Sequence, residues 1–274
     1  MKSGFSLIAR KLVVFGLRLL VVSGFCGITA VRAEDTVQSV LDCMRGNLPP
    51  AVRVQDVELT SFDRSGKTRD MKGKLFVMKD KDKGLVRATL RISAPPDLSG
   101  AAYLLRESAG DGEDQMFVYL PAVSRVRRIT GASADGSLMG TDLSYNDVKE
   151  VENAFSGSEV KLEPAEDLDG RAVWALSMSP RAGQASRYNL VRGWIDRKSC
   201  VALKVDFYEN GEVRKELRAP ASALQQSGTY WYASEAEMSD VKEGTKTRLR
   251  VVGVAASNSI PTGYFDPHSF YLGN

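Results

Sequence analysis

Residues 114–147 read DQMFVYLPAVSRVRRITGASADGSLMGTDLSYND, an apolar run followed by a basic run and a glycine-rich loop. The apolar run predicts a strand in which Met116 and Val118 point to one side. Phe117 and Tyr119 point to the other side, because successive side chains of a strand alternate. Both faces of this strand are apolar, which is typical of a strand between two covering layers. Helices of the same chain or a bound apolar ligand could cover the second face.

The rest of the chain shows the same period of two, and the turns between the runs are rich in Gly, Asp and Asn. About a dozen short-turned strands predict a mainly β (α+β) fold. We expect a strongly curved antiparallel sheet that forms an open, incomplete β-barrel with helices plugging its mouth. A barrel this wide has room for a ligand cavity. The predicted strands are 52–62, 70–78, 85–93, 101–107, 115–120, 123–129, 172–178, 189–196, 202–208, 212–217, 230–238 and 245–254.

Two segments show a helical period instead. The first follows Asp35, which is placed to cap it, with Gln38 at the capping-box spacing. Its apolar face holds Val37, Val40, Leu41 and Met44. The second is predicted over 145–155, beginning at Ser144 and Asp147.

The first 33 residues are typical of a cleaved secretory signal peptide, since a basic start precedes an apolar run and a Val-Arg-Ala cleavage site. Arg18 interrupts the apolar run, which argues against a permanent membrane anchor. A lipid-attached Cys26 is the less favoured alternative. The mature chain, residues 34–274, is then expected to be one domain.

Removal of this segment changes the charge, because residues 1–33 hold five basic and no acidic side chains. The 37 basic and 34 acidic residues of the whole chain become 32 and 34. A slightly acidic chain lacks the basic surface that nucleic acids require, so no nucleic-acid partner is expected. No later segment has the length of a membrane-spanning helix, so no stable span is expected in the mature chain.

The mature chain holds two cysteines, Cys43 and Cys200. In an oxidising compartment a structural disulfide is the favoured interpretation. Two buried thiols that never meet are the alternative.

Catalytic and metal-binding side chains are scarce. His268 is the only histidine, and it stands six residues from the end of the chain. With two cysteines besides, a closed four-ligand zinc site would need carboxylates. We therefore expect no enzyme, no metal and no cofactor, with an acid-pair hydrolase as the remaining enzymatic alternative.

Several motifs resemble one known family. Motifs within residues 116–147 and shorter motifs further along the chain together cover nearly all of residues 34–274. They resemble the outer-membrane lipoprotein-sorting proteins, the LolA-like superfamily of periplasmic lipid and lipoprotein carriers. The motifs are Met116–Pro121, Arg125–Ile129, Gly136–Asp142 with Tyr145 and Asp147, Asp169–Arg171, Trp194–Arg197, Leu203–Tyr208, Gly211, Lys215 and Phe265–Phe270.

The resemblance implies an open half-barrel with helices in its mouth over residues 34–274. It also implies a periplasmic carrier or chaperone that binds lipid or lipoprotein acyl chains for transfer toward the outer membrane. For relatives of this length it implies exchange with an inner-membrane transporter of the resistance-nodulation-division (RND) class and an outer-membrane acceptor. A periplasmic sensor, regulator or protein-recognition module on the same fold is the alternative.

Strand parity assigns apolar side chains to the predicted cavity, although each of them could instead be ordinary core. The predicted lining is Leu90, Ile92, Tyr103, Phe117, Tyr119, Leu203, Val205 and Phe207, with Leu138, Met139 and Leu143 in a lid. Arg125, Arg127 and Arg128 are the predicted contacts for a partner or a lipid headgroup, and a solvated strand face is the alternative for them.

Overall fold

The computed structural model describes residues 35–47, 51–80, 84–109, 112, 114–152, 158–180 and 186–272. The predicted signal peptide lies outside these residues, so its cleavage stays a prediction. In the described part, no helix is both long enough and apolar enough to cross a membrane.

Alternating apolar and polar side chains build the sheet. The strands are β1 (Val52–Phe62), β2 (Thr68–Lys79), β3 (Val86–Ala94), β4 (Ala102–Arg106), β5 (Gln115–Leu120), β6 (Arg125–Ile129), β7 (Ser158–Leu162), β8 (Glu166–Leu168), β9 (Arg171–Pro180), β10 (Leu190–Asp196), β11 (Ala202–Glu209), β12 (Glu212–Arg218), β13 (Leu224–Ser227), β14 (Tyr230–Ala233), β15 (Glu235–Asp240) and β16 (Thr245–Ser257).

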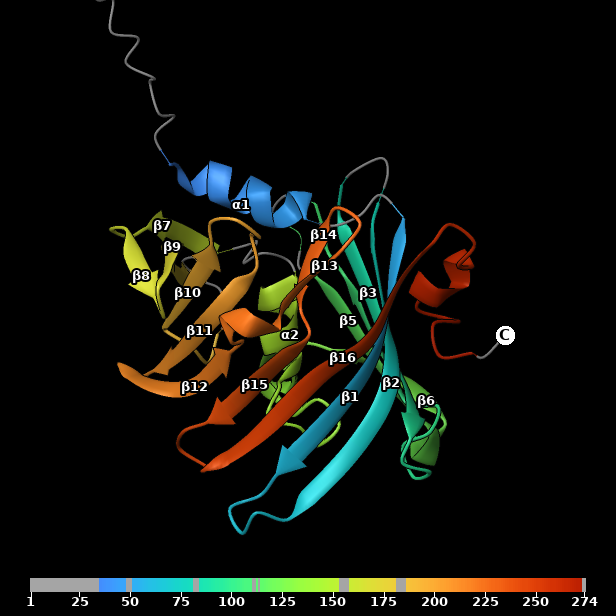
Figure 1. Ribbon diagram of the computed structural model, residues 1–274. Helices are drawn as coiled ribbons and strands as arrows, with labels where there is room; N and C mark the ends of the chain where they lie inside the picture. The colour runs from blue at the N-terminus through green and yellow to red at the C-terminus, as the bar shows by residue number, and fades with distance from the viewer. Residues whose placement is uncertain are drawn as a thin grey trace, which may run out of the picture. The chain divides into compact units, whose positions relative to one another are not determined.

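Fourteen of these strands form one antiparallel sheet in the order β6-β5-β4-β3-β2-β1-β16-β15-β12-β11-β10-β9-β7, with β8 paired to β9. β13 and β14 form a separate hairpin. The strands at the two ends of the order do not pair with each other, so the sheet is strongly curved but open (Figure 1). The predicted fold class is confirmed.

Register shifts bend the sheet, because a β-bulge increases local twist. One shift lies in β2, between Lys72 and Gly73. A Cβ atom on Gly73 would overlap the carbonyl oxygen of Arg91, so this close approach of two strands requires glycine. Further shifts lie at Asp56/Val57, Trp194/Ile195 and Phe207/Tyr208.

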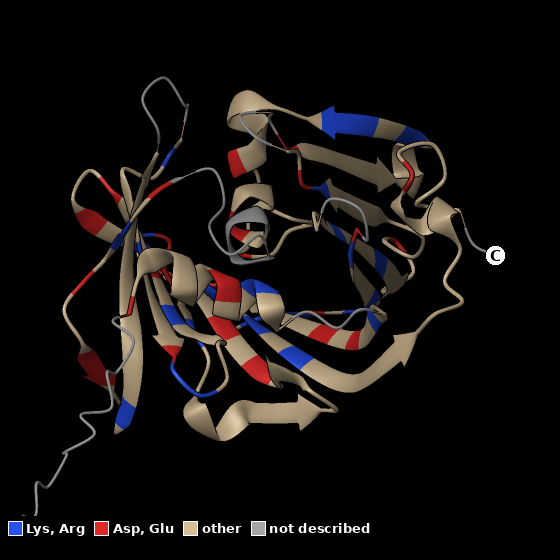
Figure 2. Ribbon diagram, turned by 90° about the horizontal axis from the view of Figure 1, so that it is seen from above, with Lys and Arg blue, Asp and Glu red and all other residues tan. Residues whose placement is uncertain are grey.

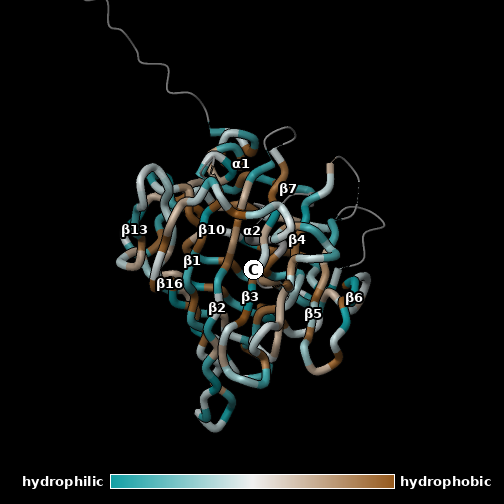
Figure 3. Tube along the Cα trace, turned by 90° about the vertical axis from the view of Figure 1, so that its right-hand side faces the viewer, coloured by the Kyte–Doolittle hydropathy of each residue, from teal (hydrophilic) through white to brown (hydrophobic). Residues whose placement is uncertain are grey.

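The two faces of the sheet have different covers. Figure 3 shows brown and teal bands alternating along several strands. On the inner face of the curve, Met116 and Val118 of β5 join the main core cluster. On the outer face, Tyr119 stacks on Tyr271 with ring centroids 4.1 Å apart, and Phe270 is fully buried beside them. The second cover of β5 is therefore the C-terminal segment of the chain, neither a helix nor a ligand.

The helix α1 (Val37–Gly46) lies across one end of the strands (Figure 1). The predicted helix is confirmed, but its predicted cap is wrong. Thr36 caps it, accepting from the Ser39 backbone N–H at 3.1 Å, while Ser39 reciprocates. Asp35 instead forms an ion pair with Arg197, with a nitrogen–oxygen distance of 2.7 Å. This contact with a residue far along the chain leaves the adjacent Thr36 to cap the helix.

The helix α2 (Tyr145–Glu152) lies inside the curve of the sheet (Figure 1). Ser144 and Asp147 begin it as expected, since each backbone N–H donates to the other side chain. The predicted end of this helix, up to residue 155, lies outside the described residues. Short 3-10 turns complete the fold: η1 (Pro121–Val123), η2 (Gly131–Asp135), η3 (Ala221–Ala223) and η4 (Thr262–Phe265).

Three strands escaped prediction: β7, β8 and β13. β8 and β13 are three and four residues long and mostly polar, so they lack a measurable period. The single strand predicted over 230–238 is two strands, divided at Ser234. The backbone N–H and the hydroxyl of Ser234 both donate to the carbonyl oxygen of Ala223, which interrupts the strand there.

The predicted disulfide is confirmed. Cys43 of α1 is bonded to Cys200, which follows β10, and their Cα atoms are 5.6 Å apart. The bond closes a sequence separation of 157 residues. It holds α1 against the half of the sheet that is distant in sequence.

Candidate functional site

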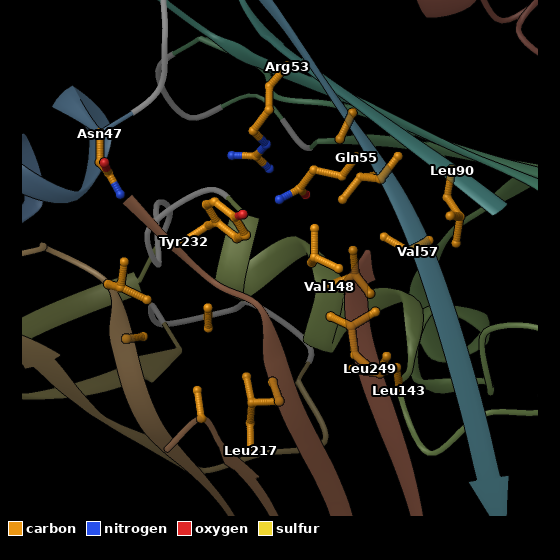
Figure 4. A pocket seen from close by; sticks show the side chains of 18 of the residues that line it. Asn47, Arg53, Gln55, Val57, Leu90, Leu143, Val148, Leu217, Tyr232 and Leu249 are labelled. Atoms are coloured by element: carbon orange, nitrogen blue, oxygen red, sulfur yellow. The ribbon is translucent and has the colours of Figure 1, made fainter. Parts of the chain in front are cut away.

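A cavity of ≈ 270 Å³ lies between the inner face of the sheet and the two helices. Most of its wall is apolar. Leu143 and Val148 of the α2 region face residues of β1, β2, β3, β12 and β16 across it (Figure 4). The main sheet residues of this apolar wall are Val57, Leu75, Leu90, Leu217, Leu249 and Val251.

One end of the cavity is polar. Arg53 and Gln55 of β1 project into it beside Tyr232 (Figure 4). Gln55 donates to the Tyr230 hydroxyl at 3.3 Å, and the Arg53 guanidinium carbon lies 4.7 Å from the centre of the Tyr230 ring. Asn47 exchanges two 2.8 Å hydrogen bonds with the backbone of Trp231, which fixes the β13–β14 hairpin at this end.

A buried ion pair stands at the base of α2. Lys215 of β12 donates to the Asp147 carboxylate at 2.8 Å, and Asp147 is fully buried. Tyr188 donates to the other oxygen of this carboxylate at 3.0 Å. Burial and the adjacent charge of Asp147 raise the pKa of Tyr188, so its hydroxyl stays protonated. A buried carboxylate needs such partners, because an isolated charge in the interior is strongly unfavourable.

Residues 137–148, which we call the lid segment, close one side of the cavity. Asp142 at its centre accepts from the hydroxyls of Thr245 and Thr247 of β16. Its carbonyl oxygen accepts from Lys215 at 2.6 Å. Polar contacts to two strands thus hold the lid segment in place.

Four of the predicted lining residues border the cavity: Leu90, Tyr103, Leu138 and Leu143. Ile92 and Met139 are buried in the same core cluster without bordering it. Val205 and Phe207 lie beneath α1 in a second cluster, packed with Val40. These four side chains are core in this structure.

The assignment of Phe117 and Tyr119 to the cavity is wrong. Tyr103 pairs with Val118, and directly paired residues of a sheet project to the same face. Val118 therefore points inward, while Phe117 and Tyr119 pack against the C-terminal segment. The parity was shifted by one residue between neighbouring strands.

The assignment of Leu203 is wrong for a different reason. Trp194 pairs with Lys204 but Ile195 pairs with Ala202, so Leu203 is the extra residue of a β-bulge. The bulge turns Leu203 to the outer face, where it packs with Trp194. Ala202 borders the cavity in its place.

The sequence analysis also missed residues that do border the cavity. Arg53 and Gln55 share the buried parity of Val57 and Leu59 in β1. Polar side chains at inward-facing positions of an alternating strand were the available signal. No comparable signal marked the hairpin residues Tyr230 to Ala233, because their position depends on tertiary contacts.

The three predicted contact arginines lie on β6, the edge strand of the sheet, where Figure 2 shows blue bands. Arg125, Arg127 and Arg128 are exposed, and no ion pair among the described residues involves them. Arg127 is near Tyr145, where its charge opposes the rise in the pKa of Tyr145 that burial causes. These arginines stand apart from the polar end of the cavity, which β1 provides.

The only histidine contributes nothing to this site. His268 is exposed in the C-terminal segment. Across the described ranges, no three His, Cys, Asp or Glu side chains are grouped to hold a metal ion.

An open curved antiparallel sheet with two helices and an apolar cavity on its inner face is the LolA-like fold, and solved structures share it. A DUF1329 family protein from Desulfovibrio piger has 23% identity and a TM-score of 0.75, with 85% of this chain and 98% of that chain covered. An outer membrane lipoprotein-sorting protein domain from Vibrio parahaemolyticus has 20% identity and a TM-score of 0.75, covering 85% and 97%. A LolA superfamily protein from Nitrosomonas europaea has 17% identity and a TM-score of 0.65, covering 85% and 98%.

The chain also matches a family model. A family model with the description "Uncharacterized protein" matches residues 84–270, and the chain belongs to that family. A comparison with curated proteins gave no match.

Proposed function

We propose that the protein is a periplasmic carrier that binds lipid or lipoprotein acyl chains in its cavity for transfer toward the outer membrane. The observation that carries this proposal is the apolar wall between the inner face of the sheet and the lid segment. The Vibrio parahaemolyticus domain supports it, since that domain shares the fold and its name refers to outer membrane lipoprotein sorting.

Acyl chains suit such a wall energetically. Each methylene group that moves from water into an apolar site contributes about 0.8 kcal/mol. A ligand of this kind needs a complementary apolar surface that excludes water more than it needs specific hydrogen bonds. Aliphatic side chains such as Leu75, Leu249 and Val251 form such a surface.

Native mass spectrometry of protein purified from the periplasm without detergent tests the proposal. Acylated cargo should co-purify with the wild-type protein. It should be absent from a Leu249→Arg variant, because the substitution places a charge in the cavity. Val252→Arg is the matched control, since Val252 lies on the same strand but is 53% exposed. Wild-type protein that is empty and also refuses added lipid would refute a carrier.

The proposed location depends on the predicted signal peptide. N-terminal sequencing of the exported protein should find Glu34 as the first residue. An intact N-terminus would contradict cleavage. Retention in the cytoplasm would contradict the location and with it the proposed exchange with an RND-class transporter and an outer-membrane acceptor.

Protein recognition is the second candidate function, and the edge strand β6 favours it. An edge strand presents unpaired backbone groups, and here it also presents three exposed arginines. If recognition is the function, Glu substitutions at Arg125 and Arg128 should abolish it while Leu249→Arg has no effect. The carrier hypothesis requires Leu249→Arg to abolish function, whatever the arginine variants do.

A further inference from the structure

The strand β6 is an edge of the sheet. It stands last in the strand order, and Figure 2 shows its blue bands at the margin of the sheet. It pairs with β5 over all five of its residues without a register shift. Within the described ranges, its backbone is hydrogen-bonded to the backbone of no segment other than β5. A regular edge of this kind offers a row of backbone donors and acceptors to an added strand.

The arginines of β6 place positive charge on both faces of this edge. Arg127 pairs with Val118, which belongs to the inner core cluster, so Arg127 is on the inner face. Arg125 shares that face, because it is two residues away on the same strand. Arg128 pairs with Phe117 and is therefore on the outer face. A strand added to this edge would meet a cation on each of its own faces.

The neighbouring strand supplies the acidic partners of basic side chains elsewhere in the sheet. Lys72 of β2 is directly opposite Glu58 of β1, and the two form an ion pair at 2.8 Å. Arg248 of β16 is directly opposite Glu237 of β15, with a nitrogen–oxygen distance of 3.5 Å. β6 has a neighbour on one side only, and β5 carries no acidic side chain. Its three arginines are exposed and have no ion pair with any residue that the structure describes.

These charges select among the partners that an edge strand could bind. Three arginines on one edge repel the same edge of a second copy and attract a strand of opposite charge. The planar guanidinium group adds a geometric preference, because its fork of donors fits a carboxylate. An anionic membrane surface fits less well, since side chains on opposite faces of a strand point away from each other. An added strand, in contrast, has side chains on both faces.

We propose that β6 binds an extended acidic segment of a partner protein by strand addition. Carboxylates of this segment lie opposite Arg125, Arg127 and Arg128, where the Cβ atoms of directly paired residues are about 5 Å apart. The half-buried Val126 takes an apolar neighbour. In an antiparallel segment the pattern reads acid, acid, apolar, acid. The proposal rests on the second candidate function, protein recognition, and names its class of partner; it does not depend on the cavity.

Titration of the exported protein with a short peptide, followed by NMR, tests the proposal. The probes are Thr-Val-Glu-Glu-Val-Glu-Thr, for antiparallel pairing, and the reversed sequence, for parallel pairing. One of them should bind and slow the hydrogen exchange of β6 amides, because an added strand bonds the outward-facing N–H groups. Arg125→Glu together with Arg128→Glu should weaken this binding by about tenfold or more, since like charges then stand opposite each other.

Two controls separate strand addition from simple attraction between charges. Arg250→Glu should leave binding unchanged, because the Arg250 side chain is 57% exposed but lies on the central strand β16. Methylation of alternate backbone nitrogens of the peptide keeps its charge and prevents strand pairing. Of the two alternate sets, one should abolish binding when methylated. Binding that survives both methylations but is lost on Glu substitution would overturn strand addition and leave protein recognition at β6 standing.

The same measurements identify other occupants. Failure of both peptides overturns the acidic strand, and binding of phosphatidylglycerol vesicles in their place assigns an anionic membrane to β6. Protection of the β6 amides that rises with protein concentration, without peptide, assigns the edge to a second copy. Leu249→Arg should not alter peptide binding, so the carrier hypothesis is decided separately by its cargo. If the double Glu variant does not fold, the methylated and unmethylated peptides on wild-type protein still decide.

Discussion

The helix α1 and the lid segment both cover the inner face of the sheet, but they are fastened by different chemistry. A covalent bond joins Cys43 of α1 to Cys200. The lid segment depends on hydrogen bonds and charge, chiefly the contacts of Asp142 and the ion pair of Asp147 with Lys215. Reduction would remove the first of these attachments, and substitution of a few polar side chains would remove the second.

This difference has a physical consequence. A disulfide stabilises a protein mainly by restricting the conformations of the unfolded chain, so its contribution does not depend on charge. A buried ion pair acts on the folded chain, and its loss leaves a charge without compensation. The lid segment is therefore the cover whose attachment depends on charge, and α1 is the cover whose attachment does not.

The largest effect is expected from the disulfide. A double Cys43→Ser, Cys200→Ser variant should lose about 5 kcal/mol of unfolding free energy, because the bond closes a long loop. Urea denaturation at neutral pH measures this loss. Reduction of the wild-type protein should reproduce it. A loss below about 1 kcal/mol would show that α1 is held by its packing alone.

The ion pair should have the next largest effect. Lys215→Met leaves the Asp147 carboxylate buried without its cation and should cost about 3–5 kcal/mol. Adding Asp147→Asn to the same chain should recover part of the loss, since no charge then remains. Lys246→Met is the control, because its pair with Glu237 is only partly buried and should contribute less than about 1 kcal/mol. Equal losses for the two lysines would contradict the proposed fastening of the lid segment.

A smaller loss is expected from the hydroxyl that supports the same carboxylate. Tyr188→Phe keeps the ring against Phe207 and removes only the donor to Asp147. Hydrogen bonds to charged groups contribute about 1.5–3 kcal/mol, so urea denaturation should show a loss in that range. The loss should vanish when Asp147 is already replaced by Asn. An undiminished loss in that background would mean that the hydroxyl acts elsewhere.

The smallest effect concerns the turn that presents Cys200. Burial alone would raise the pKa of Asp196, but hydrogen bonds from Arg171 and Ser199 outweigh burial and lower it below its ordinary 3.8. The carboxylate therefore stabilises the fold above pH 3.8, and this contribution disappears as the pH falls through the lower pKa of the folded chain. Asp196→Asn should cost about 1 kcal/mol at pH 7. Urea midpoints measured from pH 7 to pH 2 should show the two proteins converging in acid, and a constant difference would refute the assignment.

The fold was more predictable than the cavity, and β5 shows why. Its alternation of Met116, Phe117, Val118 and Tyr119 established a strand covered on both faces. A period of two says that neighbours differ, but it does not say which of the two faces turns inward. That choice came from the pairing of Val118 with Tyr103, a contact between strands.

The bulge at Leu203 shows a second limit. An apolar residue in a regular alternation was expected inside, but one extra residue in β11 turned it outward. Bulges come from the strain of pairing twisted strands. The sequence of a single strand therefore gives little indication of where a bulge will form.

The sequence by itself determined the elements of this protein: the long strands, the two helices, the pairing of Cys43 with Cys200, and the class of fold. Local patterns decide the strands and helices, because backbone geometry fixes where each successive side chain points. The disulfide could be predicted because only two cysteines follow residue 33. The tertiary structure alone decided which residues border the cavity and that Arg53 stands at its polar end. It also decided that the C-terminal segment covers the outer face of β5. These features depend on contacts between residues far apart in the chain, which no local period records.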